Sequence, residues 1–212
     1  MPNLAKDTEL RAEFKFLRLK NLNHEKYCEL NNRSEILSLK DINLNLSDNY
    51  RLVRYDAQQG QFELALLCDI SESVIYYLRC NVWQDLCLHE TPVTQILLWR
   101  SNNEIHMQAT HNFARSIFKN YLLSTYGMIA SDANQSALGQ QFWEAQIGTA
   151  LRNNHFVYRY DRMSGQVKRI TDYNAILDYS CDLWGDDSEK YEHILALISL
   201  HPISPREREL IT

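Results

Sequence analysis

The chain has 212 residues, 45% of them hydrophobic, so it is long enough to fold around a core of its own without disulfides. Its formal net charge of −5 at pH 7 argues against general nucleic-acid binding, which needs many Lys and Arg side chains on one face. The five cysteines are odd in number and lack C-x-x-C spacing, and there is no run of about eighteen apolar residues, so we expect a soluble cytoplasmic protein with no membrane span.

The first half of the chain reads as an N-terminal extension followed by antiparallel strands. Residues 1–34 are predicted to hold a short amphipathic helix, with Leu10, Phe14 and Leu17 at helical spacing, and then an irregular run. Four strands are predicted next, over 50–57, 61–70, 73–83 and 91–100. Because short turns separate them, a four-stranded antiparallel meander is the expected arrangement.

The second half alternates helices and strands. A helix capped by Thr110 or Asn112 is predicted to run to about Tyr126, where Gly127 ends it before a short strand over 128–130. Further elements are a helix from about Ser136, a hairpin over 155–170 that turns near Gly165, and a helical tail from Thr171.

These elements predict an α+β fold with a mixed, mostly antiparallel sheet flanked by helices. The expected organisation is a single domain over residues 1–212. It comprises an N-terminal helical or irregular extension (1–34), a core (50–170) and a C-terminal helical segment (171–212).

The order meander, helix, strand, helix, hairpin over 50–170 resembles the GNAT acyltransferase fold, in which a central strand splays from its neighbour and acyl-CoA lies in the gap. In that family a loop of R/Q-x-x-G-x-G/A type precedes the first long helix, and its amides and the helix N-terminus hold the pyrophosphate. The corresponding segment here is Ala109-Thr110-His111-Asn112-Phe113-Ala114, in which the final small residue matches.

The resemblance implies acyl-CoA as the cofactor and residues of this loop as its contacts. The implied binding residues are Thr110, His111, Asn112, Phe113 and Ala114. Asn tolerates a left-handed backbone, so Asn112 is a possible substitute for the loop glycine. The tyrosine that acts as general acid in many family members has no counterpart in residues 139–143.

Three residues are candidates for catalysis. Ser131 and Asp132 follow the strand over 128–130, and ligands in α/β sheets bind at the carboxyl ends of strands. Alternatively, Asp132 and Ser136 bind the backbone amides of the turn and of the start of the next helix, as Asp and Ser commonly do. His106 precedes the loop, where a histidine is either a base for an amine or a residue without a catalytic role. No spacing in the chain predicts a metal site.

Two functions are compatible with these patterns. The first is a divergent or degenerate GNAT-like protein, an N-acyltransferase that uses acyl-CoA on an amine acceptor. The alternative, favoured by the poor match of the loop at 109–114, is a non-catalytic bacterial or phage accessory protein that binds a protein partner. Its contact with a protein partner would use a basic hairpin formed by Arg159, Arg162, Lys168 and Arg169. Separately, residues 114–143 look like an acyltransferase-like module of bacterial and phage proteins. The acceptor, the partner and the oligomeric state are left open.

Overall fold

A computed structural model describes residues 3–4, 14–40, 42–58, 60–85, 88, 92–131, 134–135, 137–178, 183 and 193–203. The strands are β1 (Asn3–Leu4), β2 (Glu35–Leu37), β3 (Tyr50–Gln58), β4 (Gln61–Cys68), β5 (Ser73–Trp83), β6 (Val93–Arg100), β7 (Met128–Ala130), β8 (Asn134–Gln135), β9 (Phe156–Asp161), β10 (Val167–Ile170) and β11 (Ile194–Ser199). The helices are α2 (Lys15–Arg18), α3 (Lys20–Arg33), α4 (Met107–Thr110), α5 (Phe113–Ser116), α6 (Ser124–Tyr126), α7 (Ala137–Arg152) and α8 (Tyr173–Asp178), with the 3₁₀-helix η1 (Glu104–His106) and the π-helix η2 (Ile117–Leu123).

Nine of the described strands form one sheet in the order β10-β9-β11-β7-β6-β5-β4-β3-β2, and β1 pairs with β8 separately. The predicted α+β class with a mostly antiparallel sheet is confirmed. The chain divides into two compact units, and a single domain over 1–212 stays a prediction. The meander unit consists of Arg11–Val82 and Ile96–Leu122, and the hairpin unit of Met1–Leu10, Trp83–Gln95 and Leu123–Thr212. In the described part of the chain, no helix has the length and apolarity needed to cross a membrane.

The meander unit has a sheet covered on both faces. β3 and β5 both pair antiparallel with β4, and Ala65 of β4 lies opposite Val53 and Tyr77. Directly opposed residues point to the same face, and these three form a core with buried side chains of the N-terminal helices, including Leu30. On the other face, the Phe113 ring packs against Tyr76 with centroids 4.8 Å apart. The helix that follows β6 therefore covers the second face.

Helix α3 corrects the expected irregular run in the N-terminal extension. Three side chains at helical spacing are buried along it, namely Asn23, Tyr27 and Leu30. The Asn23 amide donates to Leu17 O (2.8 Å) and Val74 O (3.0 Å), and its Oδ1 accepts from Val74 N–H (2.8 Å). The buried stripe starts with a polar residue, so a search for apolar periodicity alone misses this helix.

The helix after β6 agrees with its prediction in extent. It runs through α5, η2 and α6, and Asn112 stands at its N-cap position. Gly127 follows it with φ of 74°, and the Gly127 N–H donates to Leu123 O at 2.8 Å. This left-handed glycine closes the helix as expected, directly before β7.

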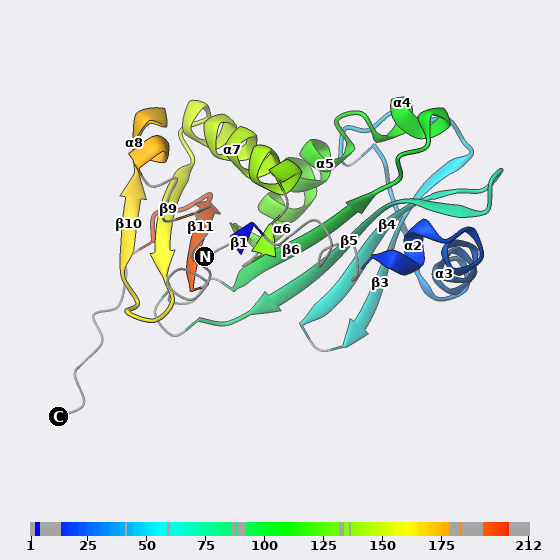
Figure 1. Cartoon of the computed structure of the whole chain (residues 1–212), viewed down its shortest axis with the longest axis horizontal. Helices are drawn as coiled ribbons and strands as arrows, with labels where there is room; N and C mark the ends of the chain where they lie inside the picture. The colour runs from blue at the N-terminus through cyan, green and yellow to red at the C-terminus, as the bar shows by residue number, and fades with distance from the viewer. Residues whose placement is uncertain are drawn as a thin grey trace. The chain divides into compact units, whose positions relative to one another are not determined.

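The hairpin unit contains the predicted β9–β10 hairpin, with Gly165 in the turn at φ of 73°. Val93–Gln95 of β6 also belong to this unit, and β6 and β7 are parallel, with Thr94 opposite Ile129. Helix α7 packs against β9 (Figure 1). Trp143 of this helix is buried.

The C-terminal segment corrects the prediction of a helical tail. Its helix α8 ends at Asp178, and Ile194–Ser199 form strand β11, which lies antiparallel between β7 and β9. All six β11 residues are buried. A strand buried on both faces reads as a continuous apolar run without alternation, which sequence periodicity does not distinguish from a buried helix.

Candidate functional site

The segment between β6 and the covering helix contains the predicted cofactor loop. The 3₁₀-helix η1 begins after Asn103, whose Oδ1 accepts from Ile105 N–H at 3.1 Å, and α4 leads to the turn at His111. Asn112 then adopts φ of 58° and ψ of 0°, a left-handed conformation. Its carbonyl accepts from Ser116 N–H at 2.9 Å, so the helix begins directly after it.

The Asn112 side chain makes no capping hydrogen bond to this helix. The Asn112 side chain therefore does not accept a hydrogen bond from the first-turn amides of Phe113, Ala114 or Arg115. Asn112 and Arg115 are exposed at this end. The amino end of a helix carries a partial positive charge, and Arg115 adds a full one, an arrangement of the kind that suits an anionic group. Arg115 is not among the residues predicted from the sequence, although it directly follows Ala114 of the predicted loop.

The five predicted cofactor residues divide into anchors and exposed groups. Phe113 is fully buried, and Thr110 is buried with its Oγ1 donating to Met107 O at 3.2 Å. His111 and Asn112 are exposed, and Ala114 is half-buried. Phe113 and Thr110 therefore fix the backbone from the core side, and His111 and Asn112 are the polar residues that face solvent.

His106 is a buried hydrogen-bonding group of the meander unit. Its Nδ1 lies 3.0 Å from Tyr50 Oη, and the two rings meet edge to face with centroids 6.0 Å apart. Burial lowers the pKa of His106, which favours the neutral imidazole. These contacts attach η1 to β3. Ile105 and Met107, on either side, are 80% and 62% exposed.

Ser131 continues the ladder between β7 and β11 in the hairpin unit. It is fully buried, and its Oγ accepts from Ala196 N–H at 3.0 Å. The Ser131 N–H donates to Ala196 O at 2.8 Å, and its carbonyl accepts from Gln95 Nε2 at 3.0 Å. The hydroxyl therefore has a structural role. Asp132, the other predicted group at this strand end, lies outside the described residues, as does Ser136.

The residues of the predicted basic hairpin do not share one face. On β9, Arg159 is buried and lies directly opposite Lys168 of β10. The next residue of β10, Arg169, lies opposite Tyr158. Successive strand residues point to opposite faces, so Lys168 and Arg169 are separated by the sheet. The Arg169 guanidinium lies 4.9 Å from the centre of the Phe156 ring.

The fourth member of the hairpin set, Arg162, is exposed in the turn and lies 5.0 Å from the centre of the Trp83 ring. Among the residues that the structure describes, no three His, Cys, Asp or Glu side chains gather closely enough to hold a metal ion. Among the predicted binding residues, His111 and Asn112 are therefore the ones that the structure shows as exposed polar groups at the start of a helix.

The sequence matches no model of a known protein family, and a search among curated proteins finds no significantly similar sequence.

Proposed function

We propose that this protein is a divergent GNAT-like N-acyltransferase that binds acyl-CoA and transfers the acyl group to an amine. The observation that carries the proposal is the left-handed Asn112 at the start of the helix after β6. In the resembling family, a glycine occupies this position of the loop. Asn is among the few other residues that adopt this backbone at low cost, so the loop conformation is available without the glycine.

Phosphate groups suit the amino end of this helix for a physical reason. Backbone amides and the helix dipole favour negative charge there, and Arg115 supplies a cation within the first turn. Strands β6 and β7 are parallel, and the helix after Asn112 connects them. This connection also supports the proposed GNAT-like site, because a helix that links two parallel strands has its N-terminus near the carboxyl end of the first strand.

The transfer itself requires a neutral amine to attack the thioester carbonyl. A C–N bond forms, the C–S bond breaks, and the CoA thiolate leaves and takes up a proton. The Ser131 hydroxyl is hydrogen-bonded to the main chain of Ala196, and the His106 ring is hydrogen-bonded to Tyr50. Of the three predicted catalytic residues, Asp132 therefore stays the candidate for accepting the proton of the amine.

The alternative is a non-catalytic protein that binds an acidic protein partner. The engagement of Ser131 and His106 in structural hydrogen bonds favours this alternative. Its contact surface would be one side of the hairpin, with exposed Lys168 or Arg169 rather than the complete basic set. This proposal requires no ligand at Asn112.

Calorimetric titration with acetyl-CoA tests the two proposals against each other. We expect binding to the wild type and to Asn112→Gly, since glycine adopts the same backbone, and at least about tenfold weaker binding to Asn112→Val, because a β-branched residue disfavours positive φ. Lys168→Gln is the control, since it changes a charge in the other unit and should leave the affinity unchanged. Absence of binding to all four proteins would refute the acyl-CoA proposal.

A further inference from the structure

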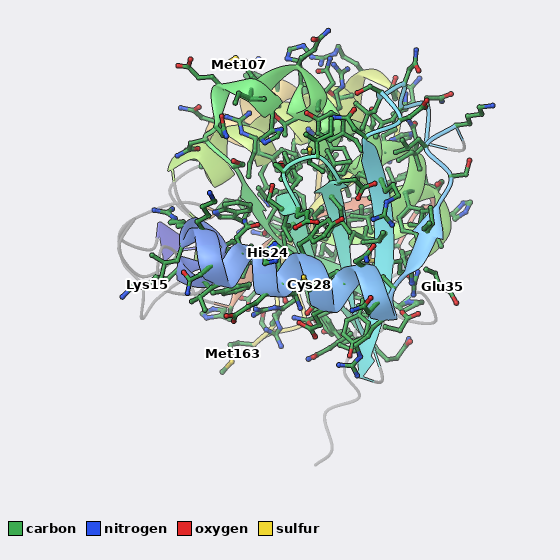
Figure 2. All side chains as sticks on the ribbon, turned by 90° about the vertical axis from the view of Figure 1, so that its right-hand side faces the viewer. Lys15, His24, Cys28, Glu35, Met107 and Met163 are labelled. Atoms are coloured by element: carbon green, nitrogen blue, oxygen red, sulfur yellow. The ribbon has the colours of Figure 1, made fainter. Side chains whose placement is uncertain are left out.

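A cluster of three reactive groups lies on helix α3 and the turn between β4 and β5. Cys28 Sγ lies 3.6 Å from His24 Nε2, one helical turn earlier. His24 Nδ1 lies 3.1 Å from the main-chain oxygen of Glu72 and 3.7 Å from Glu72 Oε2. Figure 2 shows His24 and Cys28 on the side of α3 that faces the viewer. A thiol, an imidazole and a carboxylate therefore follow one another in contact.

The contact with Glu72 determines the tautomer of His24. A carbonyl oxygen only accepts hydrogen bonds, so His24 Nδ1 must carry the proton that it donates to Glu72 O. In the neutral imidazole, Nε2 is then the acceptor, and it is the atom that faces Cys28. The Glu72 carboxylate oxygen Oε2 lies 3.7 Å from the same Nδ1, so the carboxylate can pair with the ring once Nε2 has taken a proton.

The surrounding residues hold this arrangement in place. The His24 ring stacks on Tyr27, with centroids 6.3 Å apart and planes at 16°. Tyr27 Oη donates to Asp69 Oδ1 at 3.0 Å, and Asp69 is paired with Arg51. Glu72 has φ of 45°, a left-handed turn conformation that directs its carbonyl toward the helix.

Access distinguishes Cys28 from the other described cysteines. Cys28 is half-buried, whereas Cys68 and Cys80 are buried, and burial raises the pKa of the Cys80 thiol far above its ordinary value. The side chains of His24 and Glu72 are 48% and 61% exposed. The contact between Cys28 and His24 therefore lies at the surface, while Cys28 also packs partly against the core of the meander unit.

We propose that Cys28 is a site of thiol–disulfide exchange with low-molecular-weight disulfides, with His24 as its general base and Glu72 as a positioning residue. His24 Nε2 takes the thiol proton, and the Cys28 sulfur attacks one sulfur of the disulfide. The new S–S bond forms as the old one breaks, and the departing thiolate takes the proton from His24. The products are a mixed disulfide on Cys28 and one free thiol. This activity does not depend on acyl-CoA binding.

The test measures how fast the folded full-length protein reacts with excess 4,4′-dithiodipyridine, followed by release of thiopyridone. We expect a fast phase of one thiol that is absent in Cys28→Ser. His24→Asn should slow this phase about tenfold at pH 7, since asparagine retains an amide donor for Glu72 O but offers no base. Glu72→Gln should slow it less, and Glu72→Asp, which keeps the carboxylate, should react at close to the wild-type rate.

A second reagent connects the reaction to a physiological class of disulfide. After incubation with glutathione disulfide, peptide mass spectrometry should find glutathione on the peptide that contains Cys28. Urea denaturation of each variant verifies that the fold is retained. If Cys28 in the folded protein reacts no faster than in urea, or if His24→Asn reacts at the wild-type rate, the proposal is wrong.

Discussion

The buried Asn23 side chain allows a quantitative prediction about how helix α3 is held on the sheet. Its amide group makes three hydrogen bonds, to Leu17 O, Val74 O and Val74 N–H, at 2.8, 3.0 and 2.8 Å. Asn23→Ala removes all three and leaves these backbone groups without their partner. At about 1 kcal/mol net for each bond, the loss is about 3 kcal/mol. The better helix propensity of alanine returns roughly 0.5 kcal/mol.

Urea denaturation followed by circular dichroism measures this loss. A destabilisation of this size lowers the midpoint by roughly 1 M for a protein with an m-value of about 2–3 kcal/mol/M. Asn21→Ala is the matched control, because Asn21 is exposed on the same helix and its replacement should change stability by less than about 0.5 kcal/mol. Equal midpoints for the two variants would refute the structural role given to Asn23.

Three further predictions concern stability. Gly60→Ala should cost about 2 kcal/mol, because φ is 76° and an added Cβ would lie 2.7 Å from Val82 O; wild-type stability would contradict this. Ser131→Ala should cost about 1–2 kcal/mol by leaving a buried N–H of β11 unpaired, and an unchanged urea midpoint would show that the hydroxyl is not bonded there. Hydrogen bonds from Arg51 hold the pKa of Asp69 below its ordinary value. The contribution of the Asp69 carboxylate to the free energy of unfolding is therefore complete above about pH 4 and is lost as the pH falls through the lowered pKa. Urea midpoints across this range should fall more steeply for the wild type than for Asp69→Asn, and parallel curves would contradict the pairing.

The elements with clear local signals were predictable from sequence. The turn at Gly60 and the β-rich runs on either side of it gave the β3–β4 hairpin, and Gly127 gave the end of the helix before β7. The strand β11 was not predictable, since its hydrophobic run has no period and its place between β7 and β9 is decided by long-range pairing. Helix α3 was missed because Asn23 is buried through hydrogen bonds rather than through apolar contact.

The candidate site was predictable to a smaller extent. The sequence indicated that Asn112 suits a left-handed backbone, and the structure places it in that conformation. It could not indicate that the Ser131 hydroxyl bonds to Ala196 or that His106 is bonded to Tyr50, since both partners are far away in the chain. The arrangement of Cys28 and His24 with Glu72 likewise depends on the packing of α3 against a distant turn.

The central claim is that the amino end of the helix after Asn112 binds the phosphates of acyl-CoA. The most direct measurement is a titration of ¹⁵N-labelled protein with acetyl-CoA, followed by amide resonances. We predict saturable shifts of the Phe113, Ala114 and Arg115 amides, with smaller shifts in Asn112→Val. Saturable binding that leaves these three amides unshifted, or no binding at all, would contradict the claim.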